Sequence, residues 1–183
     1  MEVRVEIKSG KKWVKRAAWS TMGKHGEPKT ELTDETFQSL LIGRHSPIEE
    51  YEVWIDAIVP ERVHTHCVRH KEIGKYIATS RPDISYMRPL EDGERYISLR
   101  INAKRLIEIM MVRKCRRSWI ETRSLFKMIA LETVKLEPAL KPFMVPSCVW
   151  YGFCNETHPD NDCEYMNTPR YAIERKDLVS LGR

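Results

Sequence analysis

Hydrophobic and charged residues alternate at the start of the chain. Val3, Val5 and Ile7 take every second position within residues 2–8. A period of two is typical of a β-strand with one buried face. Residues 50–59 repeat the pattern and predict a second strand. Its expected apolar face consists of Tyr51, Val53, Ile55, Ala57 and Val59.

Helical spacing follows each of these two segments. Residues 12–20 predict a helix, Thr33 is a suitable N-cap for another, and Pro60 suits the first turn of a third that ends near Lys71. The strongest helical pattern in the chain covers residues 102–136 and predicts one long helix.

The segments before and after this long helical pattern lack a regular hydrophobic period. Residues 80–95 contain two prolines and a glycine, which indicates a connection. Residues 138–183 are rich in proline and show no clear period. We therefore predict an α/β (α+β) fold with a mixed or antiparallel sheet in a main domain over residues 1–137. An irregular C-terminal extension over residues 138–183 is expected to pack on it.

Composition favours a soluble globular protein. The chain has 183 residues, of which 42% are hydrophobic and 31% are charged. It contains no apolar run of the roughly 20 residues that a membrane span needs, and its start lacks the apolar core of a signal peptide. Five cysteines without an export signal indicate a reducing, cytoplasmic compartment. The net charge of +5 suits an anionic ligand such as a nucleotide and is weak support for nucleic-acid binding.

One arginine falls on the apolar stripe of the predicted long helix. At 100° per residue, Arg113 lies near Leu106, Ile109, Ile120 and Asn102. A buried guanidinium cannot give up its charge and therefore needs an anion. A carboxylate of the protein and a phosphate of a ligand both satisfy this requirement.

Two basic segments allow more than one interpretation. Residues 64–71 combine three histidines with two cations at the end of a short helix. They lack the acidic residue of the HExxH metal motif, so an anionic ligand or a solvated basic face fits better than a metal. The cationic cluster over residues 113–117 is also typical of a solvated face.

The C-terminal segment contains a candidate metal site. Thiolate and imidazole groups suit tetrahedral zinc. Their spacing here matches no common zinc motif, so ordinary thiols remain the other interpretation. The candidate ligands are Cys148, Cys154, His158 and Cys163.

Several motifs together resemble the flavin-dependent thymidylate synthases. That family carries Arg-His-Arg, seven residues, then Ser; here Arg69-His70-Lys71 is followed by seven residues and Thr79, with Arg81 at the later arginine position. Further segments agree in order over about residues 15–125. They are Ala17-Ala18-Trp19-Ser20-Thr21-Met22-Gly23-Lys24, Arg44-His45-Ser46-Pro47-Ile48-Glu49, Asn102-Ala103-Lys104-Arg105-Leu106, and Glu121 with Arg123.

The resemblance implies an enzyme that moves a one-carbon unit from methylenetetrahydrofolate to C5 of dUMP. It also implies a homotetramer with FAD at the subunit interfaces and NADPH as the reductant. By motif position, the cofactor-binding residues would be His45, Ser46, Arg69, His70, Lys71 and Asn102. The substrate-binding residues would be His66, Thr79, Ser80, Arg81 and Arg113, with His66, Thr79 and Arg113 in catalytic roles.

Departures from the family pattern cluster on the substrate and flavin side. Lys71 replaces an arginine, Tyr76-Ile77 replaces Asn-Glu, and Trp119 replaces a glutamine. These changes favour an altered reaction, such as a cytosine substrate or hydroxymethylation without flavin. In hydroxymethylation, His66 would activate water. A non-catalytic module that binds nucleotide or nucleic acid is the third alternative.

Overall fold

A four-stranded antiparallel sheet forms one side of the molecule. The computed structural model describes residues 1–70, 73–77, 93–155 and 163–182. The strand order is β1-β2-β4-β3, and every neighbouring pair is antiparallel. The strands are β1 (Glu2–Ser9), β2 (Glu52–Pro60), β3 (Gly74–Ile77) and β4 (Glu94–Asn102).

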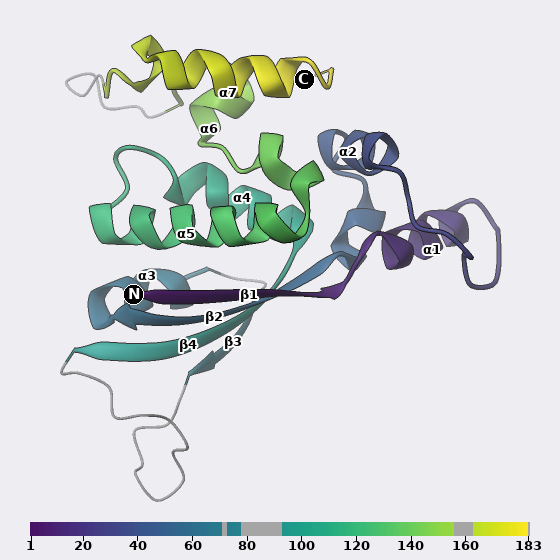
Figure 1. Ribbon diagram of the computed structural model, residues 1–183, viewed down its shortest axis with the longest axis horizontal. Helices are drawn as coiled ribbons and strands as arrows, with labels where there is room; N and C mark the ends of the chain where they lie inside the picture. The colour runs from purple at the N-terminus through teal and green to yellow at the C-terminus, as the bar shows by residue number, and fades with distance from the viewer. Residues whose placement is uncertain (71–72, 78–92, 156–162, 183) are drawn as a thin grey trace, which may run out of the picture.

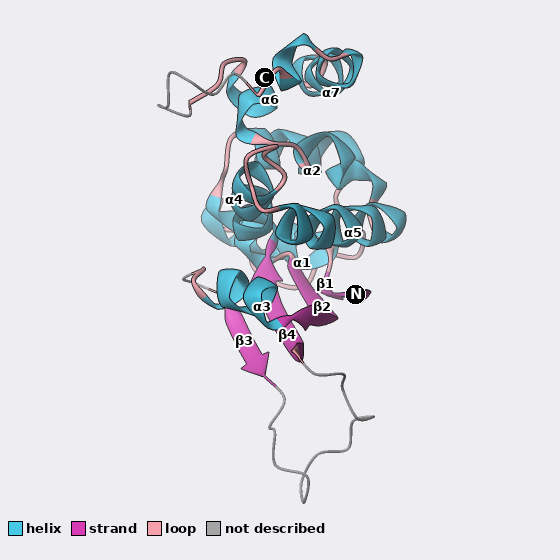
Figure 2. Ribbon diagram, turned by 90° about the vertical axis from the view of Figure 1, so that its left-hand side faces the viewer, coloured by secondary structure: helices cyan, strands magenta, loops and turns pink. Residues whose placement is uncertain are grey.

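Two helical layers lie above this sheet. Figures 1 and 2 show α4 and α5 next to the strands, with α6 and α7 stacked on the far side of those helices. Within the described part of the chain, no helix combines the length and the apolar character that crossing a membrane requires. The helices are α1 (Lys11–Thr21), α2 (Asp34–Ile42), α3 (Glu61–Val68), α4 (Ala103–Arg113), α5 (Ile120–Leu136), α6 (Ser147–Tyr151) and α7 (Pro169–Val179), with 3-10 turns η1 (Ser46–Glu50), η2 (Pro138–Phe143) and η3 (Tyr165–Asn167).

The core forms where alternate strand residues meet the helices. Val53, Ile55 and Val59 of β2 are fully buried, as the alternation predicts, whereas Trp54 and Asp56 between them are only partly buried. The antiparallel sheet packed against helices confirms the predicted fold class.

The sequence interpretation assigned no strand to residues 94–101, which form most of β4. The alternation of Ile97, Leu99 and Ile101, all buried, is the signal that could have identified it. Most of the connection expected over residues 80–95 lies outside the described residues.

The prediction of one helix over residues 102–136 is wrong. The chain leaves the helical path after Arg113, and Ser118 N donates to Cys115 O at 3.0 Å within the intervening turn. A continuous helix would be roughly 50 Å long. Strands of nine residues span only roughly 30 Å. Breaking the helix lets both halves lie against the same sheet.

The C-terminal extension is more regular than predicted. The eleven residues of α7 form a helix whose N-cap, Thr168, accepts a hydrogen bond from Tyr171 N at 3.2 Å. Leu140, Phe143 and Trp150 belong to the same buried cluster as the strand residues. The extension therefore contributes side chains to the main core.

We expect Trp150→Ala to destabilise the whole protein, because this side chain is 1% exposed and its ring lies 5.9 Å from that of Phe143. Removing a buried aromatic side chain costs about 3–5 kcal/mol of unfolding free energy. Urea unfolding followed by circular dichroism measures the loss. Phe153→Ala, at a position that is 58% exposed, is the control and should cost about 0.5 kcal/mol or less. Equal losses from the two variants would contradict the expectation.

Candidate functional site

The ends of α3 and α4 meet at a pair of side chains that the sequence singled out. Arg113 is the last residue of α4, and His70 follows the C-cap of α3. Arg113 Nε donates to His70 Nε2 at 2.8 Å. Because an acceptor nitrogen carries no proton, the His70 imidazole is neutral here. The edge of the His70 ring also faces Phe126, at 6.4 Å between centroids.

The electrostatics of the pair keep the imidazole neutral. Burial, followed by the positive charge of Arg113, lowers the pKa of His70 to about 4. Burial also lowers the pKa of Arg113, and the nearby Arg69 acts in the same direction. An arginine keeps its charge despite such a shift, so the site holds a permanent cation beside a neutral ring.

His66 lies on α3 close to this pair. Its Nδ1 is 2.8 Å from Thr122 Oγ1 on α5, and its ring lies 5.5 Å from that of Trp119. Burial, then Arg113 and Arg69, lower the pKa of His66. The structure therefore brings together His66, Arg69, His70 and Arg113, four of the residues predicted from the sequence.

The expected setting of Arg113 is only partly correct. Leu106 and Ile109 are buried, as the stripe on α4 predicts, but Ile120 is on α5 and is 64% exposed. Among the described residues, no carboxylate forms an ion pair with Arg113; its partner is the neutral His70. The charge of this partly buried guanidinium therefore remains open to an anion from outside the described residues.

A pocket of about 350 Å³ lies beside His70. This volume is in the usual range for small-molecule sites. Two arginines and one glutamate supply its charges, so the lining is net positive. The residues around it are Arg44, His70, Arg105, Glu108, Ile109, Met111, Val112, Ser147, Tyr151 and Asn155.

Arg44 is held on this pocket by several contacts. Its backbone has φ of 50°, in the left-handed region. Its guanidinium lies 5.2 Å from the centre of the Trp150 ring, and Nη2 donates to Met111 Sδ at 3.4 Å. Its Nη1 lies 4.0 Å from Glu108 Oε1. Glu108 also pairs with Arg105 at 2.8 Å.

Other predicted site residues lie apart from this group. His45 and Ser46 are exposed at the start of η1 and do not line the pocket. Asn102 caps α4, accepting from Arg105 N at 2.8 Å, and is roughly 16 Å along the helix axis from Arg113. Four further predicted residues lie outside the described residues, namely Lys71, Thr79, Ser80 and Arg81.

Sequence reasoning missed the part of the pocket that comes from the C-terminal extension. Ser147, Tyr151 and Asn155 reach it only because α6 packs next to α4, and no local pattern encodes that contact. Arg44 and Arg105, by contrast, occur inside the motifs that carry the family resemblance. The positive charge at these two motif positions is the sequence signal that could have identified them as part of the pocket.

Within the described residues, the candidate zinc ligands do not come together as a metal site. Cys148 is buried, and burial is the main cause that raises the pKa of its thiol to about 11, while Cys154 is exposed. His158 lies outside the described residues, and the remainder of the described chain holds no group of three or more potential ligands. Cys67 is fully buried, and burial raises its pKa to about 12, as expected for a packing residue.

We expect stability to fall as the pH drops from about 6.5 to about 4. In this window the unfolded chain binds a proton at His70, with its ordinary pKa of 6.5, while the folded protein does not. The unfolding free energy therefore rises with pH. His70→Gln should flatten this dependence in urea titrations at pH 7 and pH 5. His25→Gln is the control, because His25 is an exposed side chain in the loop between α1 and α2, and it should leave the slope unchanged. An unchanged slope in His70→Gln would contradict the expectation.

No protein-family model matches the sequence, and no curated protein matches it. Solved structures do share its fold. A UMP/dUMP methylase, PolB from Streptomyces cacaoi bound with 5-Br dUMP, is 12% identical with a TM-score of 0.58, over 83% of this chain and 96% of that chain. Thymidylate synthase X (ThyX) from Helicobacter pylori, solved with FAD and dUMP, is 12% identical with a TM-score of 0.59, over 77% of this chain and all of the other (100%). The chain therefore has the fold of these proteins.

Proposed function

We propose that this protein transfers a one-carbon unit to C5 of a pyrimidine nucleoside monophosphate, with dUMP as the first substrate to test. The observation that carries the proposal is Arg113, a partly buried cation whose described partner is the neutral His70. The fold shared with two proteins solved with dUMP or its bromo derivative supports this substrate class.

Arg113 is suited to hold the nucleotide phosphate. Its Nε is occupied by His70, and within the described residues neither terminal nitrogen has a hydrogen-bond partner. Those two nitrogens form the fork that matches two phosphate oxygens. His70 is then a positioning residue that fixes the orientation of the guanidinium. We include Thr79, Ser80 and Arg81 in the proposed substrate site on the motif resemblance alone.

The pocket beside His70 also fits part of a flavin cofactor. Arg44 and Arg105 on its lining supply positive charge that suits a diphosphate. FAD is much larger than a pocket of about 350 Å³, so a second copy of the chain would have to complete the site, which agrees with a homotetramer. We propose His45, Ser46, Arg69, Lys71 and Asn102 as further cofactor-binding residues.

The remaining reactants follow from the same proposal. Methylenetetrahydrofolate would donate the one-carbon unit, and bound FAD, reduced by NADPH, would supply the hydride that completes a methyl group. The chain itself orients the reactants and supplies charge. His66 is the proposed acid–base group, because its lowered pKa leaves the imidazole neutral at pH 7.

Arg113→Ala should weaken dUMP binding by about 10- to 100-fold, the loss expected when a charged hydrogen bond to phosphate is removed. Isothermal titration calorimetry measures the dissociation constant. Arg62→Ala removes an exposed arginine from α3 that pairs with Glu121 and should leave binding unchanged. Equal affinity in wild type and Arg113→Ala would rule out the proposed phosphate contact.

Flavin use is tested by the visible absorption spectrum of the purified protein with and without added FAD. We expect bound flavin that NADPH bleaches, and FAD affinity about tenfold lower in Arg44→Ala. A protein that is colourless after FAD has been added and the free FAD removed would exclude reductive methylation.

Folate-dependent hydroxymethylation of dUMP and dCMP would then be assayed. Loss of this activity in His66→Ala would be the sign that His66 activates water.

A further inference from the structure

A second hollow, of about 140 Å³, lies between the turn that joins α4 to α5, the first half of α5, and α7. Five cations line it, and none of its described lining residues is a carboxylate. The five cations are Lys114, Arg116, Arg123, Lys127 and Arg170. It shares no lining residue with the pocket beside His70.

Most of this positive charge is not neutralised. Arg116 Nη1 donates to Cys163 O at 2.8 Å, Arg123 donates to Arg116 O, and Lys114 donates to Met144 O. Carbonyl oxygens accept these bonds without cancelling the charge. Within the described part of the chain, Arg170 is the one cation of the five that forms an ion pair, at 3.0 Å from Glu174; the same carboxylate partly offsets the charge of Lys114.

Burial adds to the imbalance at Lys114. It lowers the pKa of this ammonium group to about 8, because the charged form is poorly solvated. Like charges held close together in a partly enclosed hollow raise the free energy of the folded state. An anion in the hollow would relieve that cost.

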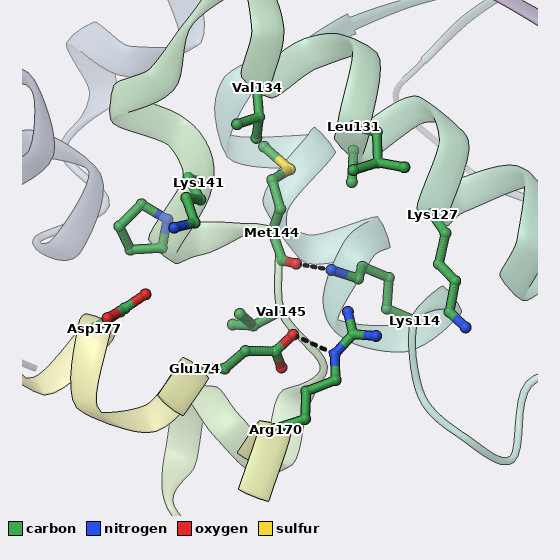
Figure 3. A pocket seen from close by; sticks show the side chains of 12 residues that line it. Lys114, Lys127, Leu131, Val134, Lys141, Met144, Val145, Arg170, Glu174 and Asp177 are labelled. Atoms are coloured by element: carbon green, nitrogen blue, oxygen red, sulfur yellow. Dashed lines mark hydrogen bonds and ion pairs between the residues drawn. The ribbon is translucent and has the colours of Figure 1, made fainter. Parts of the chain in front are cut away.

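A larger pocket, of about 340 Å³, continues from the cationic hollow and shares Lys114, Lys127 and Arg170 with it. Figure 3 shows these three cations at one end and Leu131 with Val134 along the wall. Ala130, Met144 and Val145 extend the apolar lining. Lys141, Glu174 and Asp177 also line the larger pocket. The combined space therefore has a cationic end without carboxylates and a body in which an apolar wall stands beside one lysine and two carboxylates.

We propose that this double pocket binds a phosphate monoester of a small apolar or aromatic compound. The phosphate group lies among Arg116, Arg123 and Lys127, whose guanidinium and ammonium groups match its charge and geometry. The apolar part lies against Leu131 and Val134 of α5. The site is separate from the proposed nucleotide site and does not depend on it.

Phenyl phosphate and inorganic phosphate are the probes, measured by isothermal titration calorimetry on the full chain with saturating dUMP present. We expect one site per chain and about tenfold tighter binding of phenyl phosphate, because its ring buries apolar surface. Lys127→Gln should weaken both probes about tenfold. The matched control is Lys135→Gln, on the same helix and paired with Glu132, which should change neither.

The apolar half of the pocket is tested separately. Leu131 is 63% exposed, so Leu131→Ser should fold normally, lose the preference for phenyl phosphate and keep its affinity for inorganic phosphate. Arg113→Ala should bind both probes as the wild type does, even where it has lost dUMP. This result separates the second site from the proposed function.

Four outcomes would overturn the proposal. They are no saturable binding to the wild type with or without dUMP, equal weakening by Lys127→Gln and Lys135→Gln, no effect of Lys127→Gln, and probe binding that is seen only when dUMP is left out. The last would mean that the phosphate occupies the nucleotide pocket. Equal affinity for the two probes would overturn the assignment of the apolar body.

Discussion

The turn over residues 114–119 separates two helices that share one face of a short sheet. Because the sheet is shorter than the combined helices, the chain must reverse before α5 can pack. The reversal leaves Arg113 at the end of α4, where it meets His70. It also carries Lys114 and Arg116 toward α7. The break therefore divides the cations between two places: Arg113 lies before it, next to His70, whereas Lys114, Arg116, Arg123 and Lys127 follow Arg113 and line the second hollow.

These cations are placed where the folded chain supplies little counter-charge. Arg113 is bonded to an uncharged ring, and Lys114 and Arg123 are bonded to carbonyl oxygens. Such contacts satisfy hydrogen-bonding groups while leaving a positive potential in the hollow. A structural ion pair would cancel that potential. The arrangement therefore suits recognition of anions better than it suits stability.

Local periodicity predicted β1, β2 and α1, because a buried face sets the apolar spacing. The start signals at Thr33 and Pro60 predicted α2 and α3, and these two residues are the N-caps of those helices. Periodicity failed at the break after Arg113, since α4 and α5 are each helical by pattern and only the length of the sheet forces them apart. The proximity of His66 to Arg113 could be inferred from the family motifs, whereas Tyr151 enters the pocket through tertiary packing that no local pattern encodes. The described residues do not include Thr79 or Arg81, so the motif resemblance is the basis for their roles.

The surroundings of His66 connect the altered sequence to the choice of reaction. Trp119 stands where the flavin-dependent thymidylate synthases have a glutamine. Its ring lies 5.5 Å from the His66 ring, and the hydroxyl of Thr122 forms a hydrogen bond with His66 Nδ1. Burial and Arg113 keep the imidazole neutral near pH 7. A neutral ring held through Nδ1 has Nε2 as its remaining position for proton transfer. When Nδ1 donates to Thr122, Nε2 is the proton acceptor that the proposed function requires, so the tryptophan at position 119 is compatible with the proposed role of His66 under either reaction. What separates the two is the group that would add to the one-carbon unit: a hydride from reduced flavin for methylation, or the oxygen of water for hydroxymethylation.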